Sequence, residues 1–287
     1  MEKSVVITSD SSADLPPHIR SEFGVHFFPI LVRLEGKLYR DCVDLFPKDI
    51  YAAFKERGVI PKTAAPSIGE YKDFFEGFTA QGCAVVHLSL CHKLSSCFNV
   101  ARLAAAECED VHVVDSMNFC TGSGMLCLQA ARLRDQGLCA REIAEELCRL
   151  RSKVLAYYIP ENLVFISKSG RCSALTAWGA NLLKLRPMVT VDGNSGEIVI
   201  GKKYRGPLAA VQESFLRDAV ADARGRMDDS LAFVMHTPDM RPEQFGPLGA
   251  LAKELLPNVK RWIMHDVGCT IVSHVGTECF AFIAMEK

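Results

Sequence analysis

The residues with the clearest chemical potential lie in a polar turn between a predicted strand and a predicted helix. Residues 84–90 form a short apolar run with β-branched side chains, and residues 98–106 repeat their apolar positions at a helical period. The turn between them ends in Leu94-Ser95-Ser96, so its hydroxyls lie where a helix leaves its first amides unpaired and its dipole positive. This arrangement can bind an anion, although a serine N-cap is the simpler interpretation of the same residues.

Two more polar turns follow predicted strands in the first half of the chain. They are Asp10-Ser11-Ser12, after the run at 4–9, and Asp115-Ser116, at the end of the run at 111–116. Strands alternate with helices here, which predicts a parallel sheet with helices on both faces. Ligands bind outside the carboxyl ends of such strands, so we expect the three turns to share one edge.

The helices and strands that position these turns divide the chain into two parts. The α/β alternation continues to about residue 155, and residues 156–287 show an α+β pattern. With 287 residues the chain is long enough for two domains of ordinary size. We therefore predict domains at 1–155 and 156–287, packed closely because no proline- or serine-rich linker separates them. Ser11 and Asp14 also have capping-box spacing, which predicts a helix from there to about Phe23. Residues 25–34 are strand-like and are expected to form one strand.

Composition excludes several classes of protein. The formal net charge of −1 gives no general field that would attract nucleic acid or an anionic membrane. The 12 cysteines include no C-x-x-C pair that would indicate a zinc or redox site, so we expect reduced thiols, no metal and a cytoplasmic location. No stretch resembles a signal-peptide core or approaches eighteen uncharged apolar residues, so no membrane insertion is expected.

Several short motifs, each weak alone, recur in the order and spacing of the DegV family, which the chain resembles from residue 4 to about 282. The resemblance implies an α/β fold with a Rossmann-like parallel-sheet N-terminal domain, a smaller α+β C-terminal domain, and a long-chain fatty acid bound between them. It also implies a lipid-binding protein that is not itself an enzyme. The motifs are residues 9–16, Lys62-Thr63 with Pro66-Ser67, Leu94-Ser95, residues 114–116, Gly170-Arg171, Arg186-Pro187 and residues 274–276.

The same resemblance implies a partner and a pathway. The chain would be the substrate-presenting subunit of bacterial fatty acid kinase. A dihydroxyacetone-kinase-like partner subunit would phosphorylate the bound carboxylate with ATP, and the acyl phosphate would enter phospholipid synthesis. The resemblance implies no catalytic residue on this chain, and no cofactor other than the bound fatty acid.

Site residues are carried over from the family by position. Thr63, Ser95 and His274 would bind the carboxylate, and Arg171, with Arg205 as a second candidate, would face the kinase. The residue types suit this task, because an unpaired charge buried in an apolar cleft costs several kcal/mol. Hydroxyls donate hydrogen bonds to a carboxylate without permanent charge, and a histidine supplies a proton when conditions require it.

The residues alone also allow two other functions, an acyl hydrolase and a nucleotide or sugar-phosphate binding protein. An acyl hydrolase could use Ser95 and His274 with Asp10 or Asp115 as a nucleophilic triad, but no G-x-S-x-G elbow is present. A nucleotide or sugar-phosphate site at the serine turns lacks both G-x-G-x-x-G and a P-loop. Without the resemblance, His274 would be interpreted as a satisfied core histidine in an apolar strand.

One departure from the family pattern bears on the ligand. Thr277-Glu278 stands where the family has a glycine-rich continuation after its histidine motif. A glutamate beside a fatty carboxylate would repel it. Either Glu278 points away from the carboxylate or the head group of the ligand differs.

Overall fold

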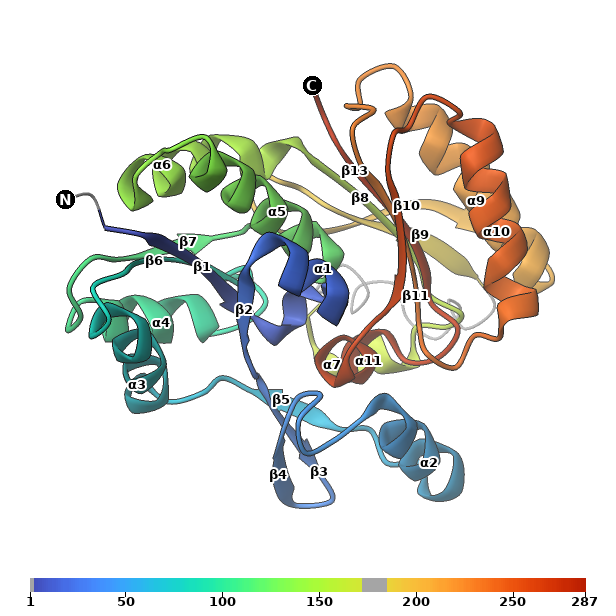
Figure 1. Ribbon diagram of the computed structural model, residues 1–287. Coiled ribbons are helices and arrows are strands. Elements are labelled where there is room, and N and C mark those ends of the chain that lie inside the picture. The colour runs from blue at the N-terminus through green and yellow to red at the C-terminus, as the bar shows by residue number, and fades with distance from the viewer. Residues whose placement is uncertain (1–2, 172–184) are drawn as a thin grey trace.

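A four-stranded parallel sheet forms the first part of the protein (Figure 1). The computed structural model describes residues 3–171 and 185–287. Buried side chains of α3 and α4 pack on one face of this sheet, and those of α5 and α6 pack on the other, which confirms the α/β prediction. The strands in spatial order are β2 (Val25–Phe28), β1 (Val5–Asp10), β6 (Ala84–Ser89) and β7 (Val111–Asp115); the helices are α3 (Ile68–Thr79), α4 (Cys97–Ala105), α5 (Thr121–Asp135) and α6 (Ala140–Leu150).

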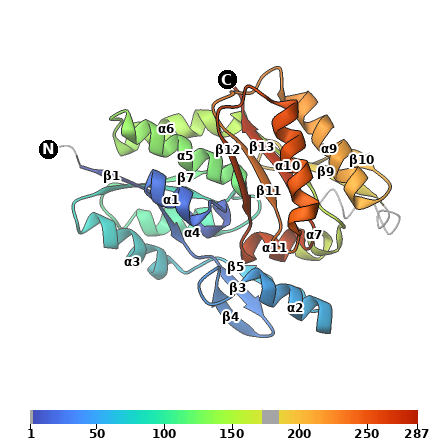
Figure 2. The ribbon, with the colours of Figure 1, turned by 45° about the vertical axis from the view of Figure 1, so that its right-hand side comes forward.

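A six-stranded sheet forms the second part, and its outer face is covered by α9 (Leu208–Ala223) and α10 (Pro242–Leu255) (Figure 2). Its neighbouring strands are antiparallel except for β11 and β12, which run parallel. Across the described residues, no helix is both long and apolar enough to span a bilayer. The strand order is β10 (Ile198–Tyr204), β9 (Arg186–Val191), β8 (Val154–Ile159), β13 (Phe280–Met285), β11 (Ala232–His236) and β12 (Trp262–Asp266).

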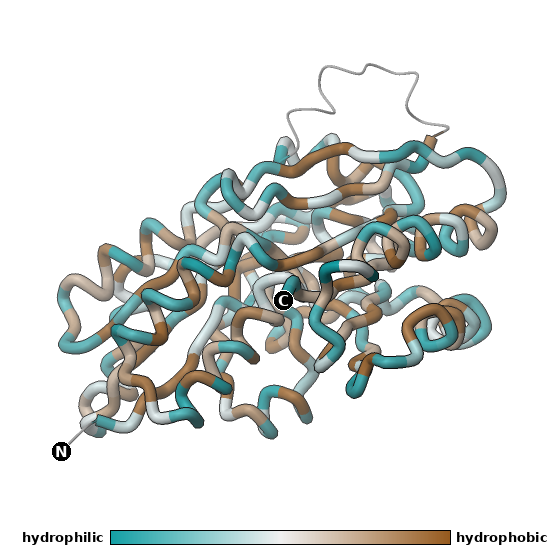
Figure 3. The backbone as a smooth tube through the Cα atoms, turned by 90° about the horizontal axis from the view of Figure 1, so that it is seen from above, coloured by the Kyte–Doolittle hydropathy of each residue, from teal (hydrophilic) through white to brown (hydrophobic). Residues whose placement is uncertain are grey.

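The two sheets share one hydrophobic core, because α5 lies between them. Its residues from Thr121 to Leu128 are all buried, and it contacts β1 and β6 on one side and β8 and β13 on the other. One buried cluster accordingly contains Ile7 of the first sheet and Phe233 of the second. The outer helices alternate hydrophobic and hydrophilic positions (Figure 3), as amphipathic helices do. This shared core accounts for the lack of a linker in the sequence.

A small third sheet projects from the body of the protein together with α2 (Pro47–Arg57) (Figure 1). Its order is β4 (Lys37–Arg40), β3 (Leu31–Leu34) and β5 (Lys62–Ala64). The short helix α11 (Cys269–Val275) contacts α2, β3 and β5, and α7 (Val164–Ser169) packs against α11. These contacts pack α11, from the C-terminal part of the chain, against the projecting sheet.

Three local expectations were wrong. Ser11 and Asp14 do not form a capping box: residues Ser11–Ala13 form a short 3-10 helix, η1, Asp14 is left-handed, and α1 spans Pro17–Phe23. Residues 25–34, expected as one strand, are β2 and β3 in two different sheets. His274 lies on a helix rather than a strand, because a short apolar run does not distinguish the two and the packing of α11 against α2 and α7 decides.

Candidate functional site

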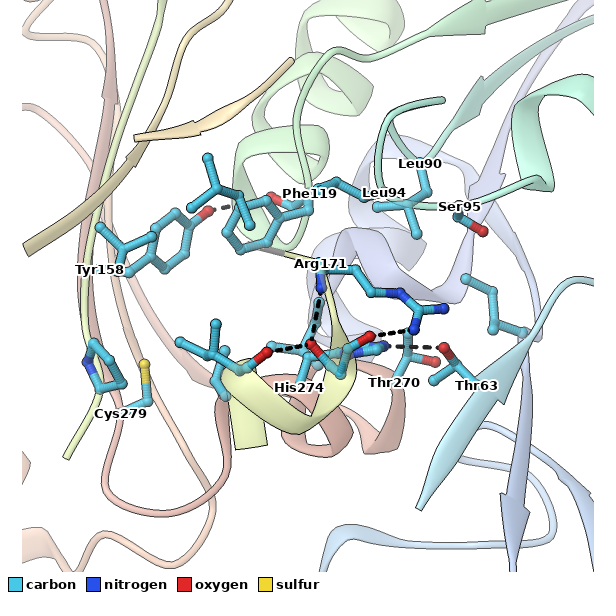
Figure 4. A pocket seen from close by; sticks show the side chains of 18 of the residues that line it. Thr63, Leu90, Leu94, Ser95, Phe119, Tyr158, Arg171, Thr270, His274 and Cys279 are labelled. Atoms are coloured by element: carbon cyan, nitrogen blue, oxygen red, sulfur yellow. Dashed lines mark hydrogen bonds between the residues drawn. The ribbon is translucent and has the colours of Figure 1, made fainter. Parts of the chain in front are cut away.

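A pocket with apolar walls and a few polar side chains lies where the edge of the parallel sheet meets β5, α7 and α11 (Figure 4). Within residues 3–171 and 185–287, its polar side chains come from four separate segments of the chain. This is the usual composition of a small-molecule site, in which apolar walls bury the ligand and a few polar groups orient it. The polar residues are Thr63, Ser95, Ser96, Ser169, Arg171, Thr270 and His274, and the apolar walls include Leu90, Leu94, Phe119, Tyr158, Ile166, Val189, Ile198, Ile271 and Val275.

The three serine-containing turns share one sheet edge, as the sequence predicts, because β1, β6 and β7 are adjacent parallel strands. Only the turn before α4 contributes serines to the pocket. Ser11 Oγ donates to Asp41 Oδ2 at 2.7 Å, and Ser116 Oγ donates to the carbonyl of Asn118 at 2.9 Å. These two serines serve the protein's own hydrogen bonding rather than a ligand.

Ser95 is half-buried on the pocket wall and also supports the start of α4. Its hydroxyl oxygen accepts the backbone N–H of Cys97 at 3.2 Å and lies 3.0 Å from Cys97 Sγ. The next residue, Ser96, precedes the helix without making a side-chain cap bond. Ser95 therefore binds the first helical amide of α4 and also lies on the pocket wall, while the N-cap residue itself is Ser96.

Thr63 and His274 meet across the pocket floor from β5 and α11. Thr63 Oγ1 lies 3.0 Å from His274 Nε2, and His274 Nδ1 is buried without a partner among the described residues. Burial lowers the pKa of His274 to about 4, and the positive charge of Arg171 adds to this effect. The ring is therefore neutral near pH 7, and its Nδ1 atom is available for a hydrogen bond with a ligand.

The two arginines lie in different places. Arg171 is exposed and lines the pocket, where its side chain donates to the carbonyl of Ser169. The left-handed position before it is taken by Gly170 with φ of 69°, so Ser169 is spared that conformation. Arg205 is exposed beyond β10 and does not line the pocket.

Glu278 points away from the pocket. Its Oε1 accepts a hydrogen bond from Gln244 Nε2 on α10, and its backbone N–H faces the Asp239 carboxylate at 3.1 Å. The side chain lies in a surface groove between α9 and α10. Of the two possibilities that the sequence leaves open, the first is correct, and Glu278 does not repel a ligand at Thr63 and His274.

The described residues do not assemble the triad of an acyl hydrolase. The Ser95 hydroxyl bonds to Cys97 and makes no hydrogen bond with His274. Asp115 Oδ2 instead lies 2.5 Å from His92 Nδ1. Asp10 accepts from Ser89 Oγ at 2.7 Å inside the parallel sheet. Each carboxylate proposed for a triad is thus engaged elsewhere.

Two wall residues were missed by sequence reasoning. Phe119 and Tyr158 stack with their ring centroids 4.7 Å apart, and the Tyr158 hydroxyl donates to the carbonyl of Phe119 at 3.2 Å. They come from the turn before α5 and from β8. An aromatic residue in a strand is more often core than pocket, so the sequence carried no signal that would single them out.

Fold and pocket together define an α/β protein with an amphipathic pocket beside a parallel sheet edge. The family model described as "Uncharacterised protein, DegV family" matches residues 4–287. The chain therefore belongs to the DegV family, as its motifs suggested.

Similar proteins extend over the whole chain. A DegV domain-containing protein of Clostridium acetobutylicum is 29% identical over 290 residues, with 100% of each chain covered. A solved structure described as fatty acid binding of a DegV family protein from Thermus thermophilus has a TM-score of 0.85 and 28% identity, covering 99% of this chain and 100% of that one. The crystal structure of DegV, a fatty acid binding protein from Bacillus subtilis, has a TM-score of 0.84 and 25% identity, with 100% of each chain covered.

Proposed function

We propose that this chain binds a long-chain fatty acid in the pocket, with the acyl chain along the apolar walls and the carboxylate beside Thr63, Ser95 and His274. The observation that carries the proposal is the composition of the pocket, which gathers its hydrogen-bonding groups among otherwise apolar side chains. Each methylene moved from water to such walls contributes about 0.8 kcal/mol. Relatives with the same fold, described as fatty-acid-binding proteins, support the same ligand class.

The chemistry of His274 suits a carboxylate. Its Nδ1 is buried without a partner, and a buried polar atom left unpaired destabilises the protein until a ligand or water satisfies it. A carboxylate beside the ring would favour the protonated form and raise the pKa from its lowered value. The histidine would then donate a charge-assisted hydrogen bond, while Thr63 and Ser95 supply neutral donors.

The second part of the proposal concerns the partner. The chain would present the bound carboxylate to a dihydroxyacetone-kinase-like subunit, which forms the acyl phosphate used in phospholipid synthesis. This part is supported by the family resemblance and by the position of Arg171, exposed at the pocket. Arg205 is a weaker candidate for the same surface, because it lies outside the pocket lining.

Mass spectrometry of extracted lipid tests the ligand. Protein purified from a bacterial host should release fatty acid into organic solvent, and delipidated protein should take it up again. His274→Ala and Ser95→Ala should each weaken uptake by about tenfold, the effect of losing one hydrogen bond to a charged group. Ser214→Ala, at an exposed serine of α9, serves as the control and should bind normally. Delipidated protein that takes up no fatty acid would refute the proposal.

Phosphorylation by the kinase tests the partner surface. Arg171→Ala should leave fatty-acid uptake intact and reduce the rate at which the kinase forms acyl phosphate. Normal phosphorylation of the Arg171→Ala protein would show that the partner binds elsewhere, without affecting the ligand assignment.

A further inference from the structure

Cysteine and aspartate side chains gather around the start of α11, outside the fatty-acid pocket. Asp41 and Cys42 follow β4, and Cys269 is the first residue of α11. A carboxylate oxygen of Asp41 and the sulfur atoms of Cys42 and Cys269 all lie within 4.8 Å of one another. None of the three residues lines the pocket. Segments from opposite ends of the chain thus bring two thiols and a carboxylate together.

A second carboxylate faces the same place. Asp14 is only 7% exposed, its Oδ1 accepts the N–H of Gly268 at 2.7 Å, and its Oδ2 is buried without a partner. Asp41 Oδ1 accepts the next amide along, that of Cys269, at 2.8 Å. A Cβ atom on Gly268 would lie 2.9 Å from Cys42 Sγ, 3.0 Å from Asp41 Oδ1 and 3.3 Å from Asp14 Oδ1. Three atoms of the kind that bind metals therefore converge on the space that this glycine leaves free.

The backbone at two of these residues adopts a conformation that non-glycine residues rarely take. Cys42 has φ of 55° and Asp14 has φ of 49°. Such a conformation persists only where surrounding structure imposes it, and it occurs often at ligand and catalytic sites. At Cys42 a glycine would relieve the strain, yet the chain has a thiol there, directed at Cys269.

We propose that Asp41, Cys42 and Cys269 bind a thiophilic divalent cation of the zinc class, with a solvent molecule as the fourth ligand. Zinc binds sulfur at about 2.3 Å and carboxylate oxygen at about 2.0–2.2 Å, which puts tetrahedral ligand atoms roughly 3.3–3.8 Å apart. The observed separations of up to 4.8 Å need shifts of about 1 Å to reach this geometry. Thiolate ligands favour zinc over magnesium or calcium, which bind oxygen.

Metal binding at this site releases protons and needs no oxidant. The cation displaces one proton from each thiol, and both protons go to solvent. The Cys269 thiol donates at present to the carbonyl of Leu45 at 3.1 Å and would exchange that hydrogen bond for the bond to the metal. Cys42 is exposed, so the cation can reach the site from solvent. The occupied site would tie the first turn of α11, the helix that carries His274, to the segment after β4. The inference does not depend on the fatty-acid proposal.

Cobalt provides a direct optical test, because a thiolate bound to Co²⁺ gives a charge-transfer band and tetrahedral Co²⁺ absorbs visible light. Reduced, metal-free full-length protein titrated with Co²⁺ should saturate at one equivalent with both features. Zn²⁺ should displace the cobalt and should raise the midpoint of thermal unfolding.

Cys42→Gly is the sharpest variant, since it relieves the positive φ and should fold at least as well as the parent chain. It should bind Co²⁺ at least about tenfold more weakly and lose part of the charge-transfer band. Cys269→Ala should behave in the same way towards Co²⁺. Cys148→Ser, at an exposed cysteine on α6, is the matched control and should bind like the parent chain.

Two outcomes would overturn the site. One is a Co²⁺ spectrum of equal intensity in Cys42→Gly and the parent chain. The other is a reduced parent chain that does not bind Co²⁺ or Zn²⁺ at one equivalent. This second outcome includes the case in which peroxide joins Cys42 and Cys269 in a disulfide but the reduced thiols bind no metal.

Discussion

Two threonine–histidine pairs of almost the same length stand in contrasting surroundings. Thr8 Oγ1 lies 2.9 Å from His87 Nδ1, and Thr63 Oγ1 lies 3.0 Å from His274 Nε2. The first pair joins neighbouring strands β1 and β6 and is fully buried, whereas the second joins β5 to α11 at the pocket. The same pair of residue types thus lies in the sheet interior in one place and lines a pocket in the other.

The other nitrogen of each ring accounts for the difference. His87 Nε2 lies 3.4 Å from Asp10 Oδ1, and that carboxylate also accepts from Tyr71 at 2.5 Å and from the amide of Leu90 at 2.8 Å. Burial alone would raise the pKa of Asp10, but the hydrogen bond and charge of His87, together with the hydrogen bond from Tyr71, outweigh it and lower that pKa. Neither His87 Nε2 nor His274 Nδ1 forms a hydrogen bond within the described residues, but His87 Nε2 has the Asp10 carboxylate beside it and His274 Nδ1 has no described carboxylate within 4 Å. A polar network that supplies its own carboxylate stabilises the fold, whereas a network that lacks one has room for a carboxylate from a ligand.

The largest expected effect comes from removing the internal carboxylate. Asp10→Ala leaves the ring of His87 and the hydroxyl of Tyr71 without their shared acceptor, so the free energy of unfolding should fall by about 3–5 kcal/mol. Urea unfolding followed by circular dichroism measures this loss. Asp10→Asn keeps the size and one acceptor oxygen, so it should lose less and, once folded, should still take up fatty acid. A loss below about 1 kcal/mol for Asp10→Ala would show that the network is not structural.

A second prediction uses the unsatisfied ring. Burial, with the nearby charge of Arg171, lowers the pKa of His274 to about 4 in the folded, ligand-free protein, whereas an exposed histidine has a pKa near 6.5. Between these values the unfolded chain binds the proton and the folded chain does not. The free energy of unfolding should therefore decrease as the pH falls from about 6.5 to about 4, by at most about 3 kcal/mol from this residue.

Comparison with His274→Gln isolates this contribution, because His265, whose pKa burial also lowers to about 4, remains in both proteins. The variant should lose less stability over the same pH range. Bound fatty acid should also reduce the loss of stability of the parent chain over this pH range, since its negative charge favours the protonated ring and raises the pKa of His274. Parallel pH curves for the two proteins would contradict the assignment of His274.

The fold followed from the sequence where local patterns were strong. Alternating strands and helices predicted the parallel sheet, and the run before Leu94 placed a serine turn at its carboxyl edge. The division of residues 25–34 between two sheets was missed, since a strand period does not reveal which sheet receives a segment. The helical state of α11 was missed for a related reason, because its contacts with α2 and α7 decide it.

The pocket was harder to predict than the sheet. Thr63 and His274 are 211 positions apart, so no spacing within one sequence brings them together, and only the resemblance to a family did so. Asp10 shows the converse limit. As an acidic residue in a polar turn, Asp10 was a candidate for a catalytic triad. Its carboxylate instead contacts His87 on β6 and Tyr71 on α3, which the sequence does not show to be nearby. Which polar side chains already have hydrogen-bond partners depends on the packing of the folded chain.

The smallest expected effects provide the most direct test of the contrast between the two pairs. Thr8→Val and Thr63→Val each remove one hydroxyl that bonds to a histidine. Thr8→Val should lower the free energy of unfolding by about 1–3 kcal/mol, since it leaves a buried ring nitrogen unpaired, and should leave fatty-acid affinity unchanged. Thr63→Val should weaken fatty-acid binding about fivefold to tenfold, or about 1 kcal/mol, and should lower the free energy of unfolding less than Thr8→Val does, because His274 is partly buried whereas His87 is fully buried. Urea unfolding and a fluorescent fatty-acid titration on both variants give the four numbers needed. If Thr63→Val lost stability and kept its affinity, the second pair would be structural like the first, and the carboxylate would have to bind nearer Ser95.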